Sequence, residues 1–196
     1  GYGATECAPI ICYSDYKEYV PGSCGRAVVN MKVKIDSPDP ENVPGEILAK
    51  GPNVMLGYYK NPEATAETID KEGWYHTGDL GTMDRNGNIF IKGRSKNMLL
   101  SANGQNIYPE EIEAKIGMLP YVQESLVLMR QGKLEAIIVP NIQLIEQKGL
   151  SLEEAWQEIQ AQRSTLNEQV GSYEKIQRFE LRTEPFEKTP KQSIRR

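Results

Sequence analysis

The sequence predicts a mixed α/β fold of the α+β type, in which a small antiparallel β-barrel-like subdomain precedes a compact α+β domain. In residues 1–92, short apolar runs alternate with Gly, Pro, Asn and Asp, which is typical of short antiparallel strands. After Gly93, apolar residues recur at helical spacing around two strand-like runs. We therefore predict a β-rich domain over residues 1–93 and a mobile α+β domain over residues 94–196, hinged between Gly93 and Asn97.

The β-rich part contains four apolar runs that predict strands, at residues 10–13, 33–35, 46–49 and 88–91. The segment 84–88 predicts a hairpin turn, because Gly87 can adopt a positive φ angle at no steric cost. One helix is predicted at residues 62–69, where Asn61 can cap the first turn and Pro62 can occupy it.

The second part predicts a three-stranded sheet with flanking helices. The expected elements are a helix from Pro109, strands at 122–129 and 134–139 around a hairpin at 130–133, a long helix that Gly171 ends, and a strand near 178–181. Ser151 and Glu154 form the capping box that starts the long helix. Ile112 and Ile116 lie on one face of the first helix, which predicts that this face is buried.

Composition excludes several functional classes. The net charge is −4 and is spread along the chain without a cluster of basic residues, so we expect no nucleic-acid partner. No apolar run approaches the roughly 18 residues of a membrane span, so no transmembrane segment is expected. Cys7, Cys12 and Cys24 lack the spacing of a zinc site or a disulfide framework, which favours a reducing, cytoplasmic location.

The first six residues combine side chains that suit a nucleotide and its metal ion. The ring of Tyr2 can stack on a purine, and Gly3 lets the main chain approach a phosphate. The hydroxyl of Thr5 can donate to phosphate, and the carboxylate of Glu6 suits Mg²⁺, which prefers oxygen ligands. The alternative is a Gly-rich turn at the end of a strand, and these residues alone do not decide between the two.

Thr77-Gly78-Asp79 is the most specific of the short segments. One carboxylate can accept both vicinal hydroxyls of a ribose, so Asp79 is a candidate ribose ligand; the alternative is an Asp in a turn before a strand. His76, the only histidine, is interpreted as a packing or surface residue and not as catalytic. Arg94 can reach ribose or phosphate oxygens with its planar guanidinium group.

Residues 1–6, 77–79 and 93–96, followed by Tyr-Pro-Glu-Glu-Ile-Glu at 108–113, closely resemble the signature of the adenylate-forming, AMP-binding enzyme superfamily. This superfamily includes acyl-CoA synthetases, the adenylation domains of peptide synthetases and the luciferases. The resemblance covers nearly the whole chain, and the wording of the later motifs is most similar to long- or medium-chain fatty acyl-CoA synthetases. It also implies that this chain is a C-terminal portion, since it opens inside the first motif.

The resemblance implies a role for each residue of the first two motifs. Tyr2 would flank adenine, and Gly3 would lie beside the nucleotide. Thr5 would contact phosphate as a catalytic residue, and Glu6 would be both catalytic and the ligand of Mg²⁺. Asp79 would hold the ribose.

Four later residues also receive roles by resemblance. Arg94 would contact the ribose, and Lys96 would be the hinge between the domains. Asn103 and Gly104 would belong to a loop that helps to form the thioester and CoA tunnel, and the same loop is expected to be a tight hairpin.

The C-terminal tail departs from the family pattern. Adenylate-forming enzymes usually end in a Thr-x-x-Gly-Lys-like segment whose lysine stabilises charge on the reacting oxygens. Aligning Thr189 and Ile194 without a gap places Ser193 at that lysine position. Lys191 is the catalytic candidate in its place and Lys188 a more distant one, while a solvated basic tail is the alternative.

The resemblance implies the C-terminal part of an ATP-dependent acyl-CoA synthetase, which forms an acyl-adenylate from a carboxylic acid, expected to be a fatty acid, and transfers the acyl group to CoA. ATP, AMP and Mg²⁺ would bind at the site, with CoA as co-substrate, and peripheral membrane contact of the whole protein is compatible with such a function. The upstream phosphate loop and acyl pocket are expected outside this chain, so residues 1–196 alone should be inactive. The alternatives are a domain that loads a carrier-protein phosphopantetheine thiol and a non-catalytic nucleotide-binding homologue.

Overall fold

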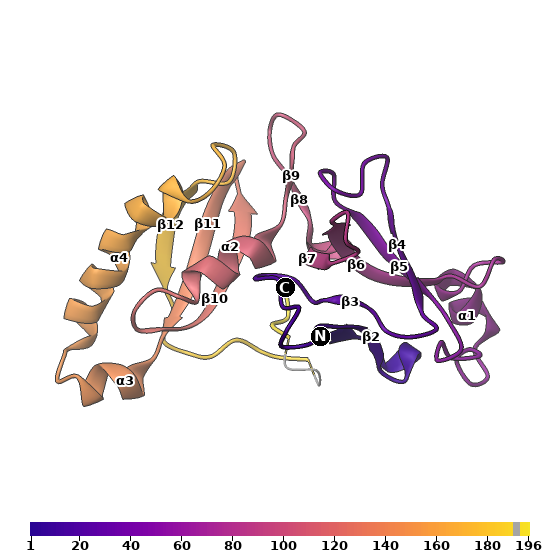
Figure 1. Cartoon of the computed structure of the whole chain (residues 1–196). Coiled ribbons are helices and arrows are strands. Elements are labelled where there is room, and N and C mark those ends of the chain that lie inside the picture. The colour runs from indigo at the N-terminus through magenta and orange to yellow at the C-terminus, as the bar shows by residue number, and fades with distance from the viewer. Residues whose placement is uncertain (190–192) are drawn as a thin grey trace. The chain divides into compact units, whose positions relative to one another are not determined.

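The computed structural model describes residues 1–189 and 193–196, and the chain divides into two compact units, Gly1–Lys96 and Asn97–Arg196 (Figure 1). The division lies within the segment that the sequence predicted as the hinge, three residues beyond the predicted domain boundary. The first unit has antiparallel sheets, the second has an antiparallel hairpin and a mixed sheet, and both contain a few helices, which confirms the predicted fold class.

The first unit contains two sheets whose neighbouring strands are all antiparallel. The smaller sheet consists of β1 (Tyr2–Gly3), β2 (Ile10–Tyr13) and β3 (Arg26–Ala27). The larger sheet consists of β4 (Lys32–Asp36), β5 (Gly45–Lys50), β6 (Tyr75–Met83) and β7 (Ile89–Arg94). The remaining elements are helix α1 (Pro62–Thr68) and the 3₁₀ turns η1 (Thr5–Cys7) and η2 (Ser95–Asn97).

The two sheets are open, and the described strands do not close into a barrel. The part predicted to be β-barrel-like is therefore a pair of open antiparallel sheets. Hydrogen bonds join the sheets at one place, where Cys24 N–H donates to Ile89 O at 2.8 Å and Ile89 N–H donates to Gly25 O at 3.0 Å. Strands of two residues at the edge of the smaller sheet are too short to continue pairing around a barrel.

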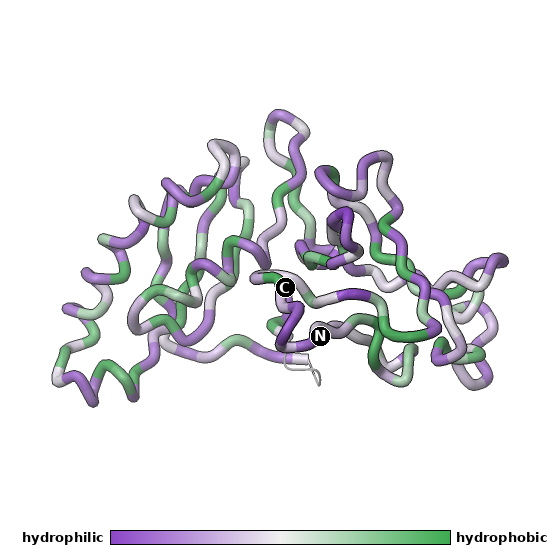
Figure 2. Tube along the Cα trace, viewed as in Figure 1, coloured by the Kyte–Doolittle hydropathy of each residue, from purple (hydrophilic) through white to green (hydrophobic). Residues whose placement is uncertain are grey.

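The core of the first unit is one apolar cluster, and hydrophobic residues recur along the strands of both units in Figure 2. Its buried members are Cys7, Ile11, Cys12, Met31, Ile35, Ile47, Ala49, Tyr75 and Ile89. The predicted helix and turn are both present. Asn61 Oδ1 accepts from Ala64 N–H at 3.0 Å and caps α1, and Gly87 adopts φ +83° in the 84–88 turn.

The second unit begins with a hairpin of β8 (Leu99–Leu100) and β9 (Asn106–Ile107). It continues through α2 (Pro109–Ile116), β10 (Val122–Arg130), β11 (Lys133–Pro140), α3 (Ile142–Gln147), α4 (Leu152–Glu168) and β12 (Ile176–Leu181). β10 and β11 form the predicted antiparallel hairpin, whereas β12 pairs with β11 in parallel. A parallel pair needs a long crossover, and α3 and α4 supply it.

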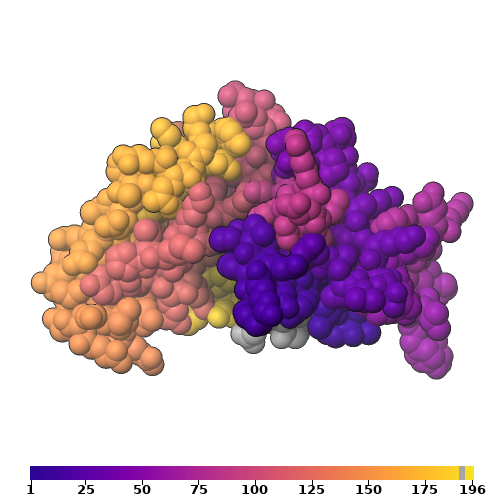
Figure 3. Space-filling model, viewed as in Figure 1, coloured from indigo at the N-terminus to yellow at the C-terminus, as the bar shows by residue number. Residues whose placement is uncertain are grey.

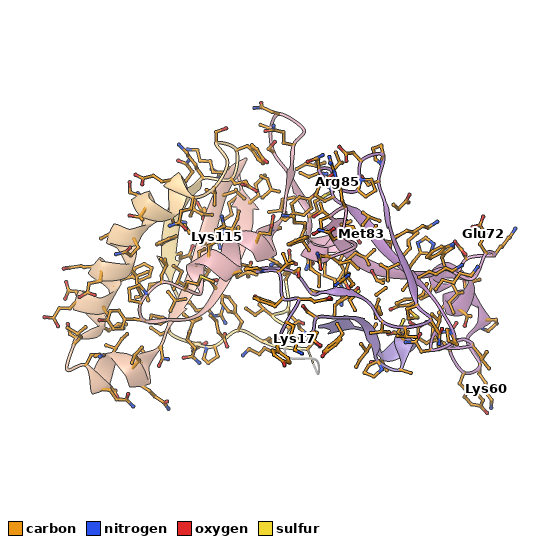
Figure 4. The ribbon with its side chains drawn as sticks, viewed as in Figure 1. Lys17, Lys60, Glu72, Met83, Arg85 and Lys115 are labelled. Atoms are coloured by element: carbon orange, nitrogen blue, oxygen red, sulfur yellow. The ribbon has the colours of Figure 1, made fainter. Side chains whose placement is uncertain are left out.

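The core of the second unit lies between this sheet and the buried sides of α2 and α4. Ile112 and Ile116 are buried as predicted, and the predicted capping box is complete: Ser151 Oγ accepts from Glu154 N–H while the Glu154 carboxylate accepts from Ser151 N–H. Lys115, labelled on α2 in Figure 4, donates to Gln169 O just after α4 at 2.7 Å. None of the helices in the part of the chain that the structure describes could cross a membrane.

We expect Ile159→Ala to lower the free energy of unfolding by about 2–5 kcal/mol, because Ile159 is fully buried in the core of the second unit and alanine would leave a cavity. Urea unfolding of the chain in a Trp74→Phe background, followed by the fluorescence of Trp156, measures this loss, since Trp156 packs against the same core. Gln160→Ala at the exposed neighbouring position is the control. Equal unfolding midpoints for the two variants would contradict the assignment of Ile159 to the core.

Candidate functional site

The carboxylate of Asp79 is the centre of the polar site in the first unit. Asp79 lies on β6 directly opposite Arg94 at the end of β7, because the antiparallel register pairs these two residues. Arg94 Nε lies 2.7 Å from Asp79 Oδ1, and Tyr2 Oη on β1 donates to Asp79 Oδ2 at 2.6 Å. Three segments distant in sequence therefore meet at one carboxylate, and they are the segments that the sequence singled out.

Asp79 is oriented as a hydrogen-bond acceptor that still reaches solvent. Its side chain is 13% exposed, and each of its oxygens has one partner, Arg94 or Tyr2. A carboxylate offers about four lone-pair sites, so two further donors, such as the vicinal hydroxyls of a ribose, can be accepted. Burial and the hydrogen bond to Asp79 raise the pKa of Tyr2, so its phenol stays protonated and acts as a donor.

The backbone before Asp79 is fixed by Thr77, Gly78 and two residues of β5, of which the sequence analysis did not select Glu46 for the site. Gly78 has φ +70°, a conformation that favours glycine, and its N–H donates to Glu46 Oε1 on β5 at 2.9 Å. Thr77 Oγ1 donates to Ile47 O at 2.7 Å and accepts from Asp79 N–H at 3.0 Å. Glu46 is therefore a missed residue of the site; its only sequence signal was its place on a predicted strand.

His76 is partly exposed on β6, and both of its ring nitrogens face carboxylates. Its Nδ1 lies 2.9 Å from Glu46 Oε2 on β5, and its Nε2 lies 3.7 Å from Asp70 Oδ2 in the loop between α1 and β6. His76 therefore contacts Glu46, whose other oxygen accepts from Gly78 N–H. That His76 is a packing or surface residue stays a prediction.

The segment that carries Gly3, Thr5 and Glu6 is a tight turn at the edge of the same unit. A Cβ at Gly3 would lie 2.1 Å from Pro9 O, so glycine is required here by the chain's own close approach, in addition to any phosphate contact. Thr5 is exposed at the start of η1. Glu6 follows it, and its Oε1 accepts from Tyr58 Oη at 2.9 Å.

The donor set around Glu6 fits Mg²⁺ as a shared ion. Within the described residues, no group of three or more His, Cys, Asp or Glu side chains is placed to hold a metal ion. Mg²⁺ usually retains water and binds through one or two carboxylates together with substrate phosphates. A single partly exposed carboxylate beside an exposed Thr hydroxyl agrees with that mode, with Glu6 as the protein ligand.

The predicted hinge and loop residues lie at the surface. Lys96 is exposed in η2, the last residue of the first unit. Asn103 and Gly104 are exposed at the tip of the β8–β9 hairpin, where Gly104 has φ +74° and its N–H donates to Ser101 O at 2.9 Å. The predicted tight hairpin is confirmed, while the roles of Lys96 and of the loop remain predictions.

A cavity of about 210 Å³ borders this hairpin within the second unit. Asn103 and Ser101 line it from the loop, and Lys133, Tyr173 and Lys175 line it from the sheet side. Two lysines and several hydroxyl groups make the cavity suited to an anionic ligand.

The structure places only part of the tail. The catalytic candidate Lys191 lies outside the described residues. Lys188, the more distant candidate, forms an ion pair within the second unit: its Nζ lies 2.5 Å from the buried carboxylate of Glu124 on β10. Ser193 is exposed and its N–H donates to Thr189 Oγ1 at 3.3 Å.

The end of the tail is attached to the second unit by Arg196. Its guanidinium group donates to both oxygens of Glu113 on α2, at 2.7 and 2.6 Å, and to Val127 O on β10 at 3.0 Å. Nη2 donates to both Glu113 oxygens and Nη1 to the Val127 carbonyl, so a carboxylate and a backbone oxygen together fix the orientation of the guanidinium group. Sequence reasoning missed this attachment, because residues 113 and 196 are joined only by the fold.

Two family models match the chain. A model described as AMP-binding enzyme matches residues 1–59, and a model described as AMP-binding enzyme C-terminal domain matches residues 96–196, which are 101 of the 196 residues.

Curated relatives are CoA ligases. A long-chain-fatty-acid–CoA ligase of Escherichia coli O6:H1 is 46% identical over 129 residues, which are 63% of this chain and 23% of that protein. A 4-coumarate–CoA ligase 1 of Solanum tuberosum is 36% identical over 207 residues, which cover 100% of this chain and 36% of that protein. The chain therefore spans between 23% and 36% of the length of these relatives.

Solved structures agree with the sequence relatives. The O-succinylbenzoate coenzyme A synthetase of Bacillus subtilis, in complex with ATP and magnesium ion, has a TM-score of 0.79 and 25% identity, over 98% of this chain and 39% of that one. An anthranilate CoA ligase in complex with anthranoyl-AMP also has a TM-score of 0.79 and 25% identity, over 98% of this chain and 37% of that one.

We expect the Glu124 carboxylate to stabilise the second unit only above mildly acidic pH. Burial acts to raise the pKa of Glu124, but hydrogen bonds from Lys188 and from Phe186 N–H lower it overall. Because the folded pKa is depressed, the stabilisation is complete above the unfolded value of about 4.3 and is lost as pH falls through the folded pKa.

Urea unfolding of the wild type and Glu124→Gln between pH 3 and 7 tests this pH dependence. The variant should be about 1–3 kcal/mol less stable at pH 7, and the difference should vanish near the acidic end. Glu184→Gln, at an exposed tail position, serves as the control. A difference that stays constant across this pH range would contradict the ion-pair explanation.

Proposed function

The chain belongs to the AMP-binding enzyme family, and from this premise we propose that the whole protein containing it is an AMP-forming acid–thiol ligase. ATP and a carboxylic acid would give an acyl-adenylate and pyrophosphate, and CoA would then accept the acyl group with release of AMP. The chain spans only part of the length of its relatives, so we assign this activity to the whole protein and expect none from residues 1–196 alone.

The observation that carries the proposal is the Asp79 carboxylate, held between Arg94 and Tyr2 on three separate segments. Such a carboxylate can accept both hydroxyls of a ribose, and Arg94, whose side chain is half-exposed, can extend toward the same ligand. Tyr2 would also present its ring to adenine, in addition to orienting Asp79.

In the first half-reaction, a carboxylate oxygen of the acid attacks the α-phosphorus of ATP, and pyrophosphate leaves. Thr5 and Glu6 are the residues of this chain proposed to lie at the phosphates, with Glu6 holding Mg²⁺. The ion, when bound, offsets the negative charge of the phosphate oxygens. Lys191 is proposed to stabilise charge that develops on the reacting oxygens.

In the second half-reaction, the CoA thiol attacks the acyl carbonyl carbon and AMP leaves. We propose that rotation about Lys96 exchanges the residues that face the site between the two steps. The loop of Asn103 and Gly104 would then help to form the thioester tunnel. The cavity beside that loop, with Lys133 and Lys175, supports this proposal because its charge suits the phosphates of CoA.

A fatty acid is the proposed substrate, on the wording of the motifs at 93–98 and 106–111 and on the identity to a long-chain-fatty-acid–CoA ligase. A 4-coumarate–CoA ligase 5 of Oryza sativa is 45% identical over 126 residues, so aromatic acids belong in the same test. Pyrophosphate exchange by the whole protein over fatty acids of different length and 4-coumarate tests this choice. The named relatives favour CoA over a carrier protein, and three free thiols suit the cytoplasm.

We expect Asp79→Asn to weaken AMP binding about 10- to 100-fold, because a charged hydrogen-bond acceptor for the ribose is lost. Calorimetric titration of the whole protein measures the affinity. Wild type should bind AMP more tightly than 2′-deoxy-AMP, and Asp79→Asn should lose most of that preference. Asp36→Asn, at an exposed position on β4, is the control. Retention of the full preference by Asp79→Asn would remove Asp79 from the ribose site.

Replacement of Lys191 should separate the two half-reactions. Lys191→Ala is expected to slow adenylate formation at least tenfold, while thioester formation from a supplied acyl-adenylate stays within twofold of wild type. Lys96→Pro should give the opposite pattern, since a fixed φ angle resists rotation after the first step. Single-turnover assays of each half-reaction measure both. Unchanged adenylate formation in Lys191→Ala would reject the displaced-lysine assignment.

A further inference from the structure

We propose that Tyr58 and helix α1 form a positioning element that orients the carboxylate of Glu6 toward the divalent cation. This inference rests on the proposed function and adds a residue to it. Tyr58 lies 52 residues from Glu6 in sequence, yet its Oη donates to Glu6 Oε1 at 2.9 Å. Burial and the nearby Glu6 carboxylate raise the pKa of Tyr75 on β6, so a second protonated phenol lies near the same carboxylate.

Tyr58 is itself fixed by α1. Its N–H donates to Thr65 Oγ1 at 2.9 Å, and Thr65 Oγ1 donates in turn to Asn61 O at 2.8 Å. The Tyr58 phenol itself donates to Glu6, and burial together with this hydrogen bond raises the pKa of Tyr58, so the phenol stays protonated. The short helix thus holds the backbone of the tyrosine whose hydroxyl group contacts Glu6.

Helix α1 has no other evident task in the core. None of its residues is buried, and it lies at the surface of the first unit (Figure 3). Lys60, labelled in Figure 4, extends outward from the turn that precedes it. The contact of this surface helix that bears on the site is the hydrogen bond between Thr65 Oγ1 and Tyr58 N–H.

The loop that precedes Tyr58 also holds its position through backbone contacts with α1 and η1. Gly57 has φ +150°, and a Cβ there would lie 2.7 Å from Thr65 Cγ2, so a side chain would push the loop off the helix. Met55 N–H donates to Glu6 O at 2.7 Å. The loop is therefore attached to the metal-ligand turn through its backbone and through the Tyr58 phenol.

Phenol donation and cation binding are compatible at one carboxylate. A carboxylate has two oxygens and about four lone-pair sites. A phenol that donates to one site fixes the orientation of the group, and lone pairs remain that can bind a cation. Hydrogen bonds to a ligating carboxylate generally fix its rotamer and raise the affinity for the metal. Tyr58 acts on the cation through Glu6 and has no part in bond making or breaking.

The neighbouring tyrosine provides a matched control. Tyr58 is 37% exposed and Tyr59 is 88% exposed, and each variant to Phe removes only a hydroxyl group. In the whole protein, without acid substrate, the melting temperature at fixed ATP is measured against Mg²⁺ concentration. Tyr58→Phe should raise the Mg²⁺ concentration for half-maximal stabilisation about three- to tenfold. Tyr59→Phe should stay within twofold of wild type, and Glu6→Gln should shift at least as far as Tyr58→Phe.

Three results would overturn the inference, and they are distinguishable. Equal Mg²⁺ curves for Tyr58→Phe and Tyr59→Phe, with Glu6→Gln still shifted, would reject Tyr58 and leave the proposed role of Glu6 intact. Loss of Mg²⁺-free ATP binding by Tyr58→Phe to the same degree would show a merely structural role. An unshifted Glu6→Gln would reject the cation site itself, and the proposed role of Glu6 with it.

Discussion

The ion pair between Asp79 and Arg94 depends on one constraint, the antiparallel register of β6 and β7. That register sets the two residues opposite each other, and a shift of one strand by one residue would put the two side chains on opposite faces of the sheet. The register is secured from the buried side by Ile89 and Ile47 and from the polar side by Glu46, which binds the Gly78 backbone. The proposed nucleotide site therefore depends on the whole sheet and cannot be assigned to one motif.

The first unit separates residues that would meet a ligand from residues that hold them. Asp79, Arg94 and Glu6 are partly exposed, whereas their supports come from neighbouring strands and loops: Tyr2, Glu46 and Tyr58. Each support donates to or accepts from a group whose orientation would otherwise be free. Such preorganisation lowers the entropy that a ligand must overcome on binding. In the proposed role of Tyr58, helix α1, which has no buried residues, contributes in the same way by holding the Tyr58 backbone.

Sequence patterns predicted most of the local structure, because local structure follows from local chemistry. The capping box at Ser151, the Asn61 cap and the Gly87 turn each depend on residues within four positions, and all three are present. The contacts between distant segments were not predictable in this way. The parallel pairing of β12 with β11, the Tyr58 contact with Glu6 and the Arg196 contact with Glu113 join residues far apart in sequence. The proposed ligand residues could be named from the sequence because they lie in recognisable motifs, whereas the residues that contact them, such as Glu46 and Tyr58, lie in no motif.

The ion pairs of the tail bear on which of its basic residues could take the place of the lysine expected at Ser193 in the proposed function. Residues 187–196 contain four basic residues, Lys188, Lys191, Arg195 and Arg196. Three of them lie beside carboxylates of their own unit. Lys188 Nζ lies 2.5 Å from Glu124 Oε1, and Arg195 Nη1 lies 3.8 Å from Glu187 Oε2. Arg196 Nη2 donates to both oxygens of Glu113.

A cation already paired with a buried carboxylate would leave that carboxylate uncompensated if it moved to a phosphate, which costs several kcal/mol. This cost falls on Lys188 and Arg196, whose partners are 8% and 16% exposed. Arg195 pairs with an exposed carboxylate over a longer distance and would move at little cost, but it stands two residues beyond the position of Ser193. Lys188 and Arg196 lie on either side of Lys191 in sequence, and their ion pairs would hold the tail to the second unit. In the proposed function, Lys191 would then serve the phosphate without the loss of such a pair, and this is the physical reason for preferring Lys191 to Lys188 or Arg196.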